Sequence, residues 1–169
     1  MKFQIARCDA YHINEILSIQ SEAFESMEHP EWLRENTKEM LLDCLGFPHV
    51  TVGAFSNSVM SGFAILFKGE KTDENLGLTL GFSGDELKSI ANFKLVIVRP
   101  MFRGHSLQRI LMTELERIAK DEDIKLLCTT VHPDNIASKI SIEKSNYIFA
   151  KRTTKYGGLL RDIYYKSLE

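Results

Sequence analysis

The sequence predicts an α/β fold in which a mixed sheet is flanked by helices, within a single domain that covers residues 1–169. One observation is a strand, a helix and a second strand that follow one another at 93–98, 106–120 and 125–131. A unit of this kind is right-handed and its two strands are parallel. The other is composition: 44% of the 169 residues are apolar and 26% are charged. These values are typical of a globular domain with a full hydrophobic core.

The first part of the chain predicts one strand and two helices. Residues 1–7 alternate polar and apolar, which indicates a strand, and Asp9 is a suitable N-cap for the helix that follows. The apolar face of this helix is formed by Ile13, Ile16, Leu17 and Phe24. A second helix comes after Pro30 and ends at Gly46 and Pro48. Its predicted face carries Leu33, Thr37, Met40, Leu41, Cys44 and Leu45.

The middle of the chain predicts three strands and a long loop. Two strands at 49–55 and 60–68 are joined by a turn of composition Ser-Asn-Ser. Residues 69–85 are polar and contain glycine, so we expect a long loop, followed by a short helix at 85–90. The strand at 93–98 has a continuous apolar run, which is typical of a central strand covered on both faces.

The last part of the chain begins with the clearest helical periodicity, at 106–120. Its buried stripe is formed by Leu107, Ile110, Leu111, Leu115, Ile118 and Ala119. After the strand at 125–131, Asp134 or Asn135 caps a short helix that runs to about Ser145. Strands at 147–153 and 159–166 then form a hairpin around two glycines.

Charge and cysteine content exclude several classes of protein. Twenty-one Lys and Arg face 23 Asp and Glu, so a nucleic acid is not an expected partner. No run of about 18 apolar residues predicts a membrane span, and the first residues lack the apolar core of an export signal. The three cysteines are an odd number without metal-ligand spacing. We therefore expect reduced thiols, no metal site and a cytoplasmic location.

The most informative stretch, residues 96–108, runs from a buried strand through a tight loop into a helix. The first amides of a helix have no partner within it and lie at the positive end of its dipole, so they suit a phosphate or pyrophosphate. Gly104 allows a close approach of the backbone, and Ser106 offers a hydroxyl. Positive charge comes from Arg103, His105 and Arg109. The alternative is an ordinary loop with a capping serine.

These residues resemble the GNAT superfamily of N-acetyltransferases. The family signature, Gln/Arg-x-x-Gly-x-Gly/Ala after a strand ending in Val-x-Val, lies over 96–108. Arg103 matches its first position, whereas Ser106 and Gln108 stand where the family has small residues. A second landmark, Asn followed by a helix ending in Glu-Lys-x-Gly-Phe/Tyr, lies over 135–147. There Asn146 replaces the glycine, and asparagine also suits a left-handed helix exit.

The resemblance implies a mixed, mostly antiparallel sheet of six to seven strands flanked by helices, with a central parallel pair splayed at the cofactor site. It implies transfer of an acetyl group from acetyl-coenzyme A to a primary amine by direct attack in a ternary complex, without a metal. A backbone N–H, taken as that of Val96, would polarise the acetyl carbonyl and stabilise the oxyanion. The implied cofactor-binding residues are Val96, Ile97, Val98, Arg103, Gly104, His105, Ser106, Leu107, Gln108, Arg109, Asn135 and Ser138.

The general base and general acid are not identified by the sequence. Many relatives place a tyrosine acid where Ile142 stands here, and Tyr147 and His132 are near it in sequence. The alternative function is a catalytically weak or inactive module that binds acyl-coenzyme A as a sensor or interaction domain. A third reading is a structural domain without a ligand. Cys128 is either a core residue or a covalent acetyl carrier.

The amine acceptor and the oligomeric state are also open at this point. Phe24 and Trp32, with Met27, either line the acceptor pocket or only pack. The same stretch of sequence carries an acidic patch that consists of Glu22, Glu25, Glu28 and Glu31. This patch either attracts a cationic amine or is a solvated helix end. Arg161 either binds an acceptor carboxylate or forms a surface salt bridge. The chain is a monomer or a homodimer, and the apolar residues that either pair two chains or pack on the core are Ile163, Tyr164 and Tyr165.

Overall fold

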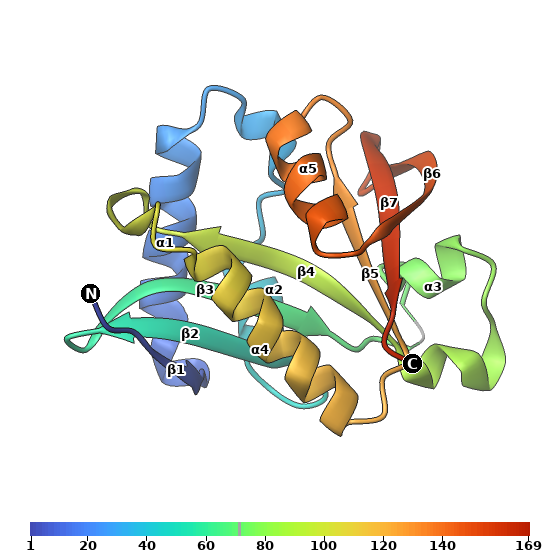
Figure 1. Cartoon of the computed structure of the whole chain (residues 1–169), viewed down its shortest axis with the longest axis horizontal. Coiled ribbons are helices and arrows are strands. Elements are labelled where there is room, and N and C mark those ends of the chain that lie inside the picture. Colours follow the sequence, from blue (N-terminus) through green and yellow to red (C-terminus); the bar gives the residue numbers. More distant parts are fainter. Residues whose placement is uncertain (71) are drawn as a thin grey trace. The chain divides into compact units, whose positions relative to one another are not determined.

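The computed structural model describes residues 1–70 and 72–169, and it is drawn in Figure 1. The strands of the described residues are β1 (Gln4–Arg7), β2 (Val50–Ser56), β3 (Val59–Phe67), β4 (Ile90–Val98), β5 (Leu126–Val131), β6 (Ile148–Lys155) and β7 (Leu159–Ser167). The α-helices are α1 (Ile13–Ser26), α2 (Lys38–Cys44), α3 (Leu76–Thr79), α4 (Leu107–Asp121) and α5 (Ile136–Lys144). Short 3-10 helices are η1 (Ala10–His12), η2 (Pro30–Trp32), η3 (Gly84–Ser89) and η4 (Pro100–Phe102).

The seven strands belong to one mixed sheet, with the order β1-β2-β3-β4-β5-β7-β6. Strands β4 and β5 pair in parallel, whereas β1–β2, β2–β3, β5–β7 and β6–β7 pair antiparallel. The predicted mixed, mostly antiparallel sheet with a parallel pair is thus confirmed. Contacts divide the chain into two compact units, a first unit of residues 1–67 and 94–118 and a second unit of residues 68–93 and 119–169. Strand β4 contributes to both.

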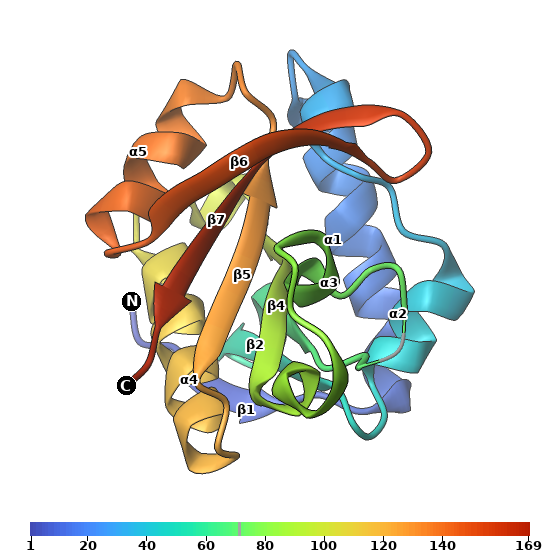
Figure 2. The same cartoon turned by 90° about the vertical axis from the view of Figure 1, so that its right-hand side faces the viewer.

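In the first unit, helices cover both faces of the strands. Figures 1 and 2 show α1 and α2 on one side of β2 and β3, and residues 107–118 of α4 on the other side. Successive side chains of a strand point to opposite faces, so alternate residues of β3 pack against α1. The core on that side consists of Cys8, Ile13, Ile16, Ile19, Ala23, Leu41, Cys44, Met60, Phe63, Ile65, Phe67, Leu95 and Ile97.

In the second unit, the hairpin of β6 and β7 lies beside β5 (Figure 2). The hairpin turns through Tyr156, Gly157 and Gly158, whose φ angles are 54°, 76° and 123°. This is the left-handed region that the predicted glycines tolerate without strain. A small core under the hairpin consists of Leu76, Leu87, Ile90, Cys128 and Ile163.

The predicted strands and helices are present, and three parts of the prediction need correction. The second helix begins at Lys38, because Thr37 is its N-cap and accepts a hydrogen bond from the Met40 amide at 3.2 Å. The predicted loop 69–85, of which residue 71 lies outside the described residues, contains α3. Strand β4 begins at Ile90 rather than at residue 93. The predicted cap at Asp9 is confirmed, although it caps η1, which leads directly into α1.

The cysteines are free and buried, as the sequence predicts for reduced thiols. Burial raises the pKa of Cys8 and of Cys128 to about 12, so both stay protonated at neutral pH. Within residues 1–70 and 72–169, no group of three or more His, Cys, Asp or Glu side chains is placed to hold a metal ion. In the same residues, no helix combines the length and the apolarity that crossing a membrane requires.

Candidate functional site

The segment from β4 to α4, in the first unit, is fixed by apolar anchors on both sides of its loop. After β4, the short η4 helix places Phe102 in the interior, where its ring meets Phe3 edge-on with centroids 6.1 Å apart. On the other side, Leu107 at the start of α4 is 2% exposed. The predicted loop of residues 103–106 is exposed between these anchors.

The loop turns sharply because two of its residues adopt left-handed conformations. Gly104 has a φ of 85° and Ser106 a φ of 59°. A Cβ at Gly104 would meet no atom within 4 Å, so a side chain would not clash there. Glycine is favoured at this position because of its positive φ. Ser106 stands where the GNAT signature has glycine, and the structure gives a reason for that preference. A non-glycine residue in this region costs roughly 1–2 kcal/mol.

The N-terminus of α4 presents backbone amides next to this loop. The amide of Ile110 donates to the Ser106 carbonyl at 3.1 Å, so the helical pattern begins there. By the geometry of a helix, the amides of residues 107–109 have no acceptor within it. The positive end of the dipole of this long helix lies at the same place. An anion suits this position, as the sequence predicts.

The basic side chains of the loop are exposed, and two of them contact other parts of the first unit. Arg103 donates a hydrogen bond through Nη2 to Ser26 Oγ at 3.2 Å. The ring of His105 lies 5.8 Å from that of Phe3. Arg109 and Gln108 are exposed on the first turn of α4. Strand residues Val96 and Val98 are half-buried and Ile97 is buried.

In the second unit, Asn135 caps α5, which decides between the two predicted candidates, Asp134 and Asn135. Its Oδ1 accepts a hydrogen bond from the Ser138 amide at 3.2 Å. The carboxamide oxygen is therefore used within the helix, and its NH₂ group is the part suited to donate to a ligand. At the other end of α5, Asn146 has a φ of 67°, which confirms the left-handed exit. The Ser138 side chain is half-buried.

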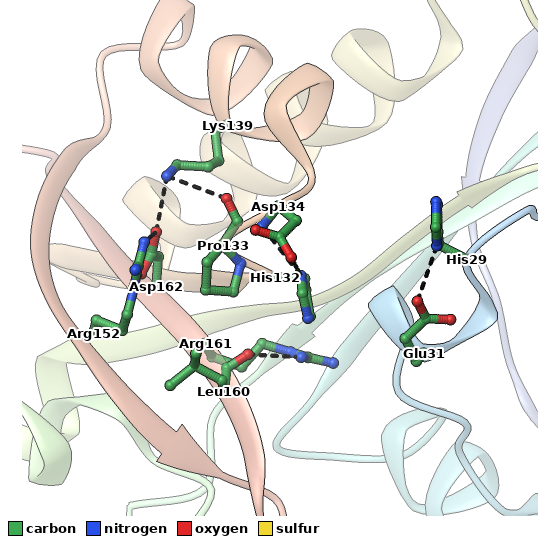
Figure 3. A network of polar contacts seen from close by, with 10 residues as sticks. All are labelled: His29, Glu31, His132, Pro133, Asp134, Lys139, Arg152, Leu160, Arg161 and Asp162. Atoms are coloured by element: carbon green, nitrogen blue, oxygen red, sulfur yellow. Dashed lines mark hydrogen bonds and ion pairs between the residues drawn. The ribbon is translucent and has the colours of Figure 1, made fainter.

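Helix α5 is held on β7 by a buried carboxylate (Figure 3). Asp162 is fully buried and accepts from Arg152 Nε at 2.7 Å, from Arg152 Nη2 at 3.2 Å and from Lys139 Nζ at 2.9 Å. Lys139 Nζ also donates to the Pro133 carbonyl at 3.5 Å. The hydrogen bonds from Arg152, together with those from Lys139, hold the pKa of Asp162 below its ordinary value of 3.8.

A second contact joins the same two elements. The buried Tyr164 hydroxyl donates to Glu143 Oε1 at 3.0 Å. Burial and this neighbouring carboxylate raise the pKa of Tyr164 to about 12. Lys139 and Glu143 are one helical turn apart, and Asp162 and Tyr164 are two residues apart on one face of β7. These two contacts fix both the position and the rotation of α5.

The residues near the predicted acid position have clear environments. Ile142 is 6% exposed and carries no proton that it could donate. His132 accepts the Asp134 amide at Nδ1 (3.1 Å), which assigns the proton of the neutral ring to Nε2 (Figure 3). Tyr147 is buried, with its ring 6.1 Å from that of Phe93. Cys128 is fully buried with a raised pKa, so it is a core residue and not an acetyl carrier.

The end of α1 and the segment after it hold the predicted acceptor residues. Trp32 stacks on His29, with the ring centroids 4.3 Å apart and the planes at 16°. His29 Nδ1 lies 3.0 Å from Glu31 Oε1 (Figure 3). Phe24 is half-buried at the end of α1. A stacked ring pair beside carboxylates suits contact with an apolar or cationic group.

This segment is also held by the buried side chain of Gln20, which forms two hydrogen bonds with the backbone of Asn36 that the sequence did not indicate. Gln20 Nε2 donates to the Asn36 carbonyl at 2.9 Å, and the Asn36 amide donates to Gln20 Oε1 at 3.0 Å. Of the acidic patch, Glu22 forms an ion pair with Arg99, while Glu25 and Glu28 are exposed. A Gln and an Asn so far apart in sequence have no periodic signal that would link them.

The exposure of side chains on β7 tests two further predictions, one for Arg161 and one for the apolar residues after it. Arg161 is 3% exposed, so its expected position at the surface is wrong. Its Nη1 donates to the Leu160 carbonyl at 2.8 Å, and burial lowers the pKa of its guanidinium (Figure 3). Ile163 and Tyr164 are buried in the core, and Tyr165 is half-buried. Core packing therefore explains Ile163 and Tyr164.

Comparisons with known proteins agree with this geometry. The model of the acetyltransferase (GNAT) family matches residues 13–144. A probable acetyltransferase from Staphylococcus epidermidis has a TM-score of 0.76 at 14% identity, covering 99% of this chain and 100% of that chain. A putative acetyltransferase from Salmonella typhimurium, solved with its cofactor acetyl-CoA, has a TM-score of 0.75 at 16% identity, covering 100% and 95%. The PaiA N-acetyltransferase from Thermoplasma acidophilum, solved with coenzyme A, has a TM-score of 0.70 at 21% identity, covering 99% and 99%. At these identities the likeness shows a shared fold, and no curated protein matches the sequence significantly.

Proposed function

Because the chain belongs to the GNAT acetyltransferase family, we propose that it transfers an acetyl group from acetyl-coenzyme A to a primary amine. The observation that carries this proposal is the loop before α4, where Gly104 and Ser106 turn the chain beside unpaired helix amides. Two solved proteins of the same fold hold acetyl-CoA or coenzyme A, which supports the same cofactor here. The family match includes both this loop and Asn135, which supports one acetyltransferase domain over residues 1–169.

The proposal gives each part of the chain one task. The backbone of residues 96–98 binds the pantetheine arm as an added strand, and the Val96 N–H stabilises the oxyanion. The amides of residues 103–109 hold the pyrophosphate, with the side chains of Arg103, His105 and Arg109 adding charge. Asn135 and Ser138 contact the pantetheine.

The reaction proposed is direct transfer in a ternary complex. The amine nitrogen, in its neutral form, forms a bond to the thioester carbonyl carbon, and the carbon–sulfur bond then breaks. The nitrogen loses a proton to a base or to water, and the departing thiolate takes one. Ile142 cannot supply that proton, so it comes from another side chain or from solvent. Phe24 and Trp32 are proposed to contact the acceptor, and the free thiols support a cytoplasmic location.

A second function is favoured by one observation. Ile142 is buried at the position where many relatives have a tyrosine acid. A protein that binds acyl-coenzyme A and turns it over poorly or not at all, as a sensor or interaction module, is consistent with this. Turnover separates the two functions, since both retain the cofactor site.

The test of the proposed function is calorimetric titration with acetyl-coenzyme A, with dephospho-coenzyme A and ATP as controls, followed by thiol release with a panel of primary amines. Micromolar binding selective for the coenzyme, together with steady thiol release, supports the transferase. Binding without thiol release for any amine supports the sensor. No binding at millimolar coenzyme contradicts both.

Two substitutions separate the structural and binding roles of Asn135. Asn135→Asp keeps an N-cap oxygen and Asn135→Ala removes it, so only Ala should lower the free energy of unfolding, by about 1 kcal/mol. Both remove the NH₂ donor, so both should weaken acetyl-coenzyme A binding several-fold. Thermal unfolding and calorimetry measure the two effects. Wild-type affinity in both variants would show that Asn135 only caps the helix.

A further inference from the structure

We propose that Arg99 is a positioning residue for the loop of residues 103–106, and that it acts through Glu22 of α1 without touching the cofactor. This inference rests on the proposed function, because it assigns that loop to the pyrophosphate. Arg99 is the residue at which the chain leaves β4 and enters η4. Arg99 lies between the Val-x-Val end of the strand and Arg103, at a position for which the family signature specifies no residue.

Arg99 is bound to its surroundings through both its backbone and its side chain. Its amide donates to the Ser61 carbonyl at 2.8 Å, and its carbonyl accepts from the Phe102 amide at 2.9 Å. Its Nε donates to the Met60 carbonyl at 2.8 Å. Its Nη1 forms an ion pair with Glu22 and lies 3.5 Å from Ser18 Oγ. One residue therefore joins β3, α1 and the first turn of the loop segment.

The contacts on α1 form a single polar stripe. Ser18, Glu22 and Ser26 are spaced four residues apart, so they lie above one another on one face of the helix. Arg99 reaches Ser18 and Glu22, and Arg103 reaches Ser26. Both ends of η4 are thus tied to α1, and the loop begins from a fixed point.

Arg99 and Arg103 differ in exposure and in the number of N–H groups that stay available to a ligand. The Arg99 side chain is 12% exposed, and its hydrogen bonds go to protein atoms. Arg103 is exposed and has one hydrogen bond of 3.2 Å to Ser26. Arg103 is therefore suited to a direct phosphate contact, whereas Arg99 acts on the cofactor by holding the loop. Only a guanidinium can donate to the Met60 carbonyl and the Glu22 carboxylate at once from a planar fork.

The test compares Glu22→Gln, Arg99→Lys and Arg99→Met, with Arg117→Met as the matched control. Arg117 lies on α4 in the same unit and pairs with Glu114, away from the loop. We expect Arg99→Met to raise the dissociation constant of acetyl-coenzyme A about tenfold. We expect Arg99→Lys to raise it almost as much, because an ammonium group does not replace the guanidinium. The control should stay at the wild-type value, and kcat should change less than KM in all variants.

Glu22→Gln distinguishes positioning from a simple effect of charge. Removing a negative charge near the loop would tighten binding of an anionic cofactor if only long-range electrostatics mattered. If Glu22 positions Arg99, the same substitution weakens binding, by about threefold. Tighter or unchanged binding in a folded Glu22→Gln variant overturns the proposal. This variant changes one partly exposed side chain, so it stays informative if Arg99→Met fails to fold.

Hydrogen exchange of the cofactor-free protein separates this inference from the proposed function. Exchange of the amides of residues 102–106 should quicken at least threefold in Glu22→Gln and Arg99→Lys and stay at the wild-type rate in Arg117→Met. Unchanged exchange in both test variants overturns the positioning role, whatever the ligand is. If exchange quickens but the wild-type protein binds no coenzyme A, then the assigned ligand is wrong and the positioning of the loop stands.

Discussion

Gly104→Glu is expected to weaken coenzyme A binding at least tenfold, the largest functional effect that we predict for a single substitution. The new carboxylate would lie beside the N-terminus of α4, where we propose that the pyrophosphate binds. Two like charges about 4 Å apart at a protein surface repel by roughly 1–4 kcal/mol. A Cβ at this position has open space around it, so the effect does not come from a steric clash inside the protein.

Gly104→Gln is the control, because it has the same size and the same backbone strain without the charge. A side chain at a φ of 85° is strained, and both variants should lose about 1–2 kcal/mol of unfolding free energy. Thermal unfolding checks that this loss is equal, and calorimetry gives the affinity. If the two variants bind coenzyme A equally, the anion does not lie next to Gly104, and the assignment of the loop must be abandoned.

The sequence predicted the elements whose signals are local. The βαβ unit followed from a continuous apolar run, a helical stripe and a second strand, and the structure confirms β4, α4 and β5 in that order. The two ends of α5 were predicted from residue type: the N-cap was narrowed to Asp134 or Asn135, and Asn146 suited the left-handed exit. The loop at Gly104 was found in the same way.

The features that the sequence did not reveal depend on pairs of residues distant along the chain. Arg99 and Glu22 are an ordinary arginine and glutamate until the fold brings them together. The same holds for the Gln20 side chain, which holds the segment after α1 through the backbone N–H and carbonyl of Asn36. Periodicity reports which face of an element is buried, but it carries no information on which polar partner lies opposite. Side chains that position the site are therefore harder to predict than the backbone that forms it.

Asp162→Asn is expected to cause the largest loss of stability, because it removes the charge on which Lys139 and Arg152 converge. Breaking a buried ion pair from one side usually costs 3–5 kcal/mol. The Lys139 and Arg152 side chains are 21% and 51% exposed, so water compensates in part. We therefore expect the free energy of unfolding to fall by about 2 kcal/mol, measured by urea denaturation at pH 7.

The pH dependence gives this prediction a second readout. The pKa of Asp162 is lowered in the folded protein, chiefly by its hydrogen bonds to Arg152, so the carboxylate stabilises the fold above its ordinary pKa of 3.8. That contribution is lost as the pH falls from about 4 through the lower pKa of the folded state. The stability curves of wild type and Asp162→Asn should consequently converge in acid and separate near neutrality.

Asp85→Asn is the matched control, since Asp85 also has a lowered pKa through its hydrogen bond to Lys88 but is 93% exposed. Solvent screens such a pair, and its removal should leave both the stability and the pH profile near those of wild type. Equal behaviour of the two variants would mean that Asp162 is no more than a surface ion pair. A gap that persists in acid would assign the loss to packing around the new amide, because an amide does not titrate. Convergence in acid, seen for Asp162→Asn alone, would establish the carboxylate as the charge that holds α5, and with it Asn135, on β7.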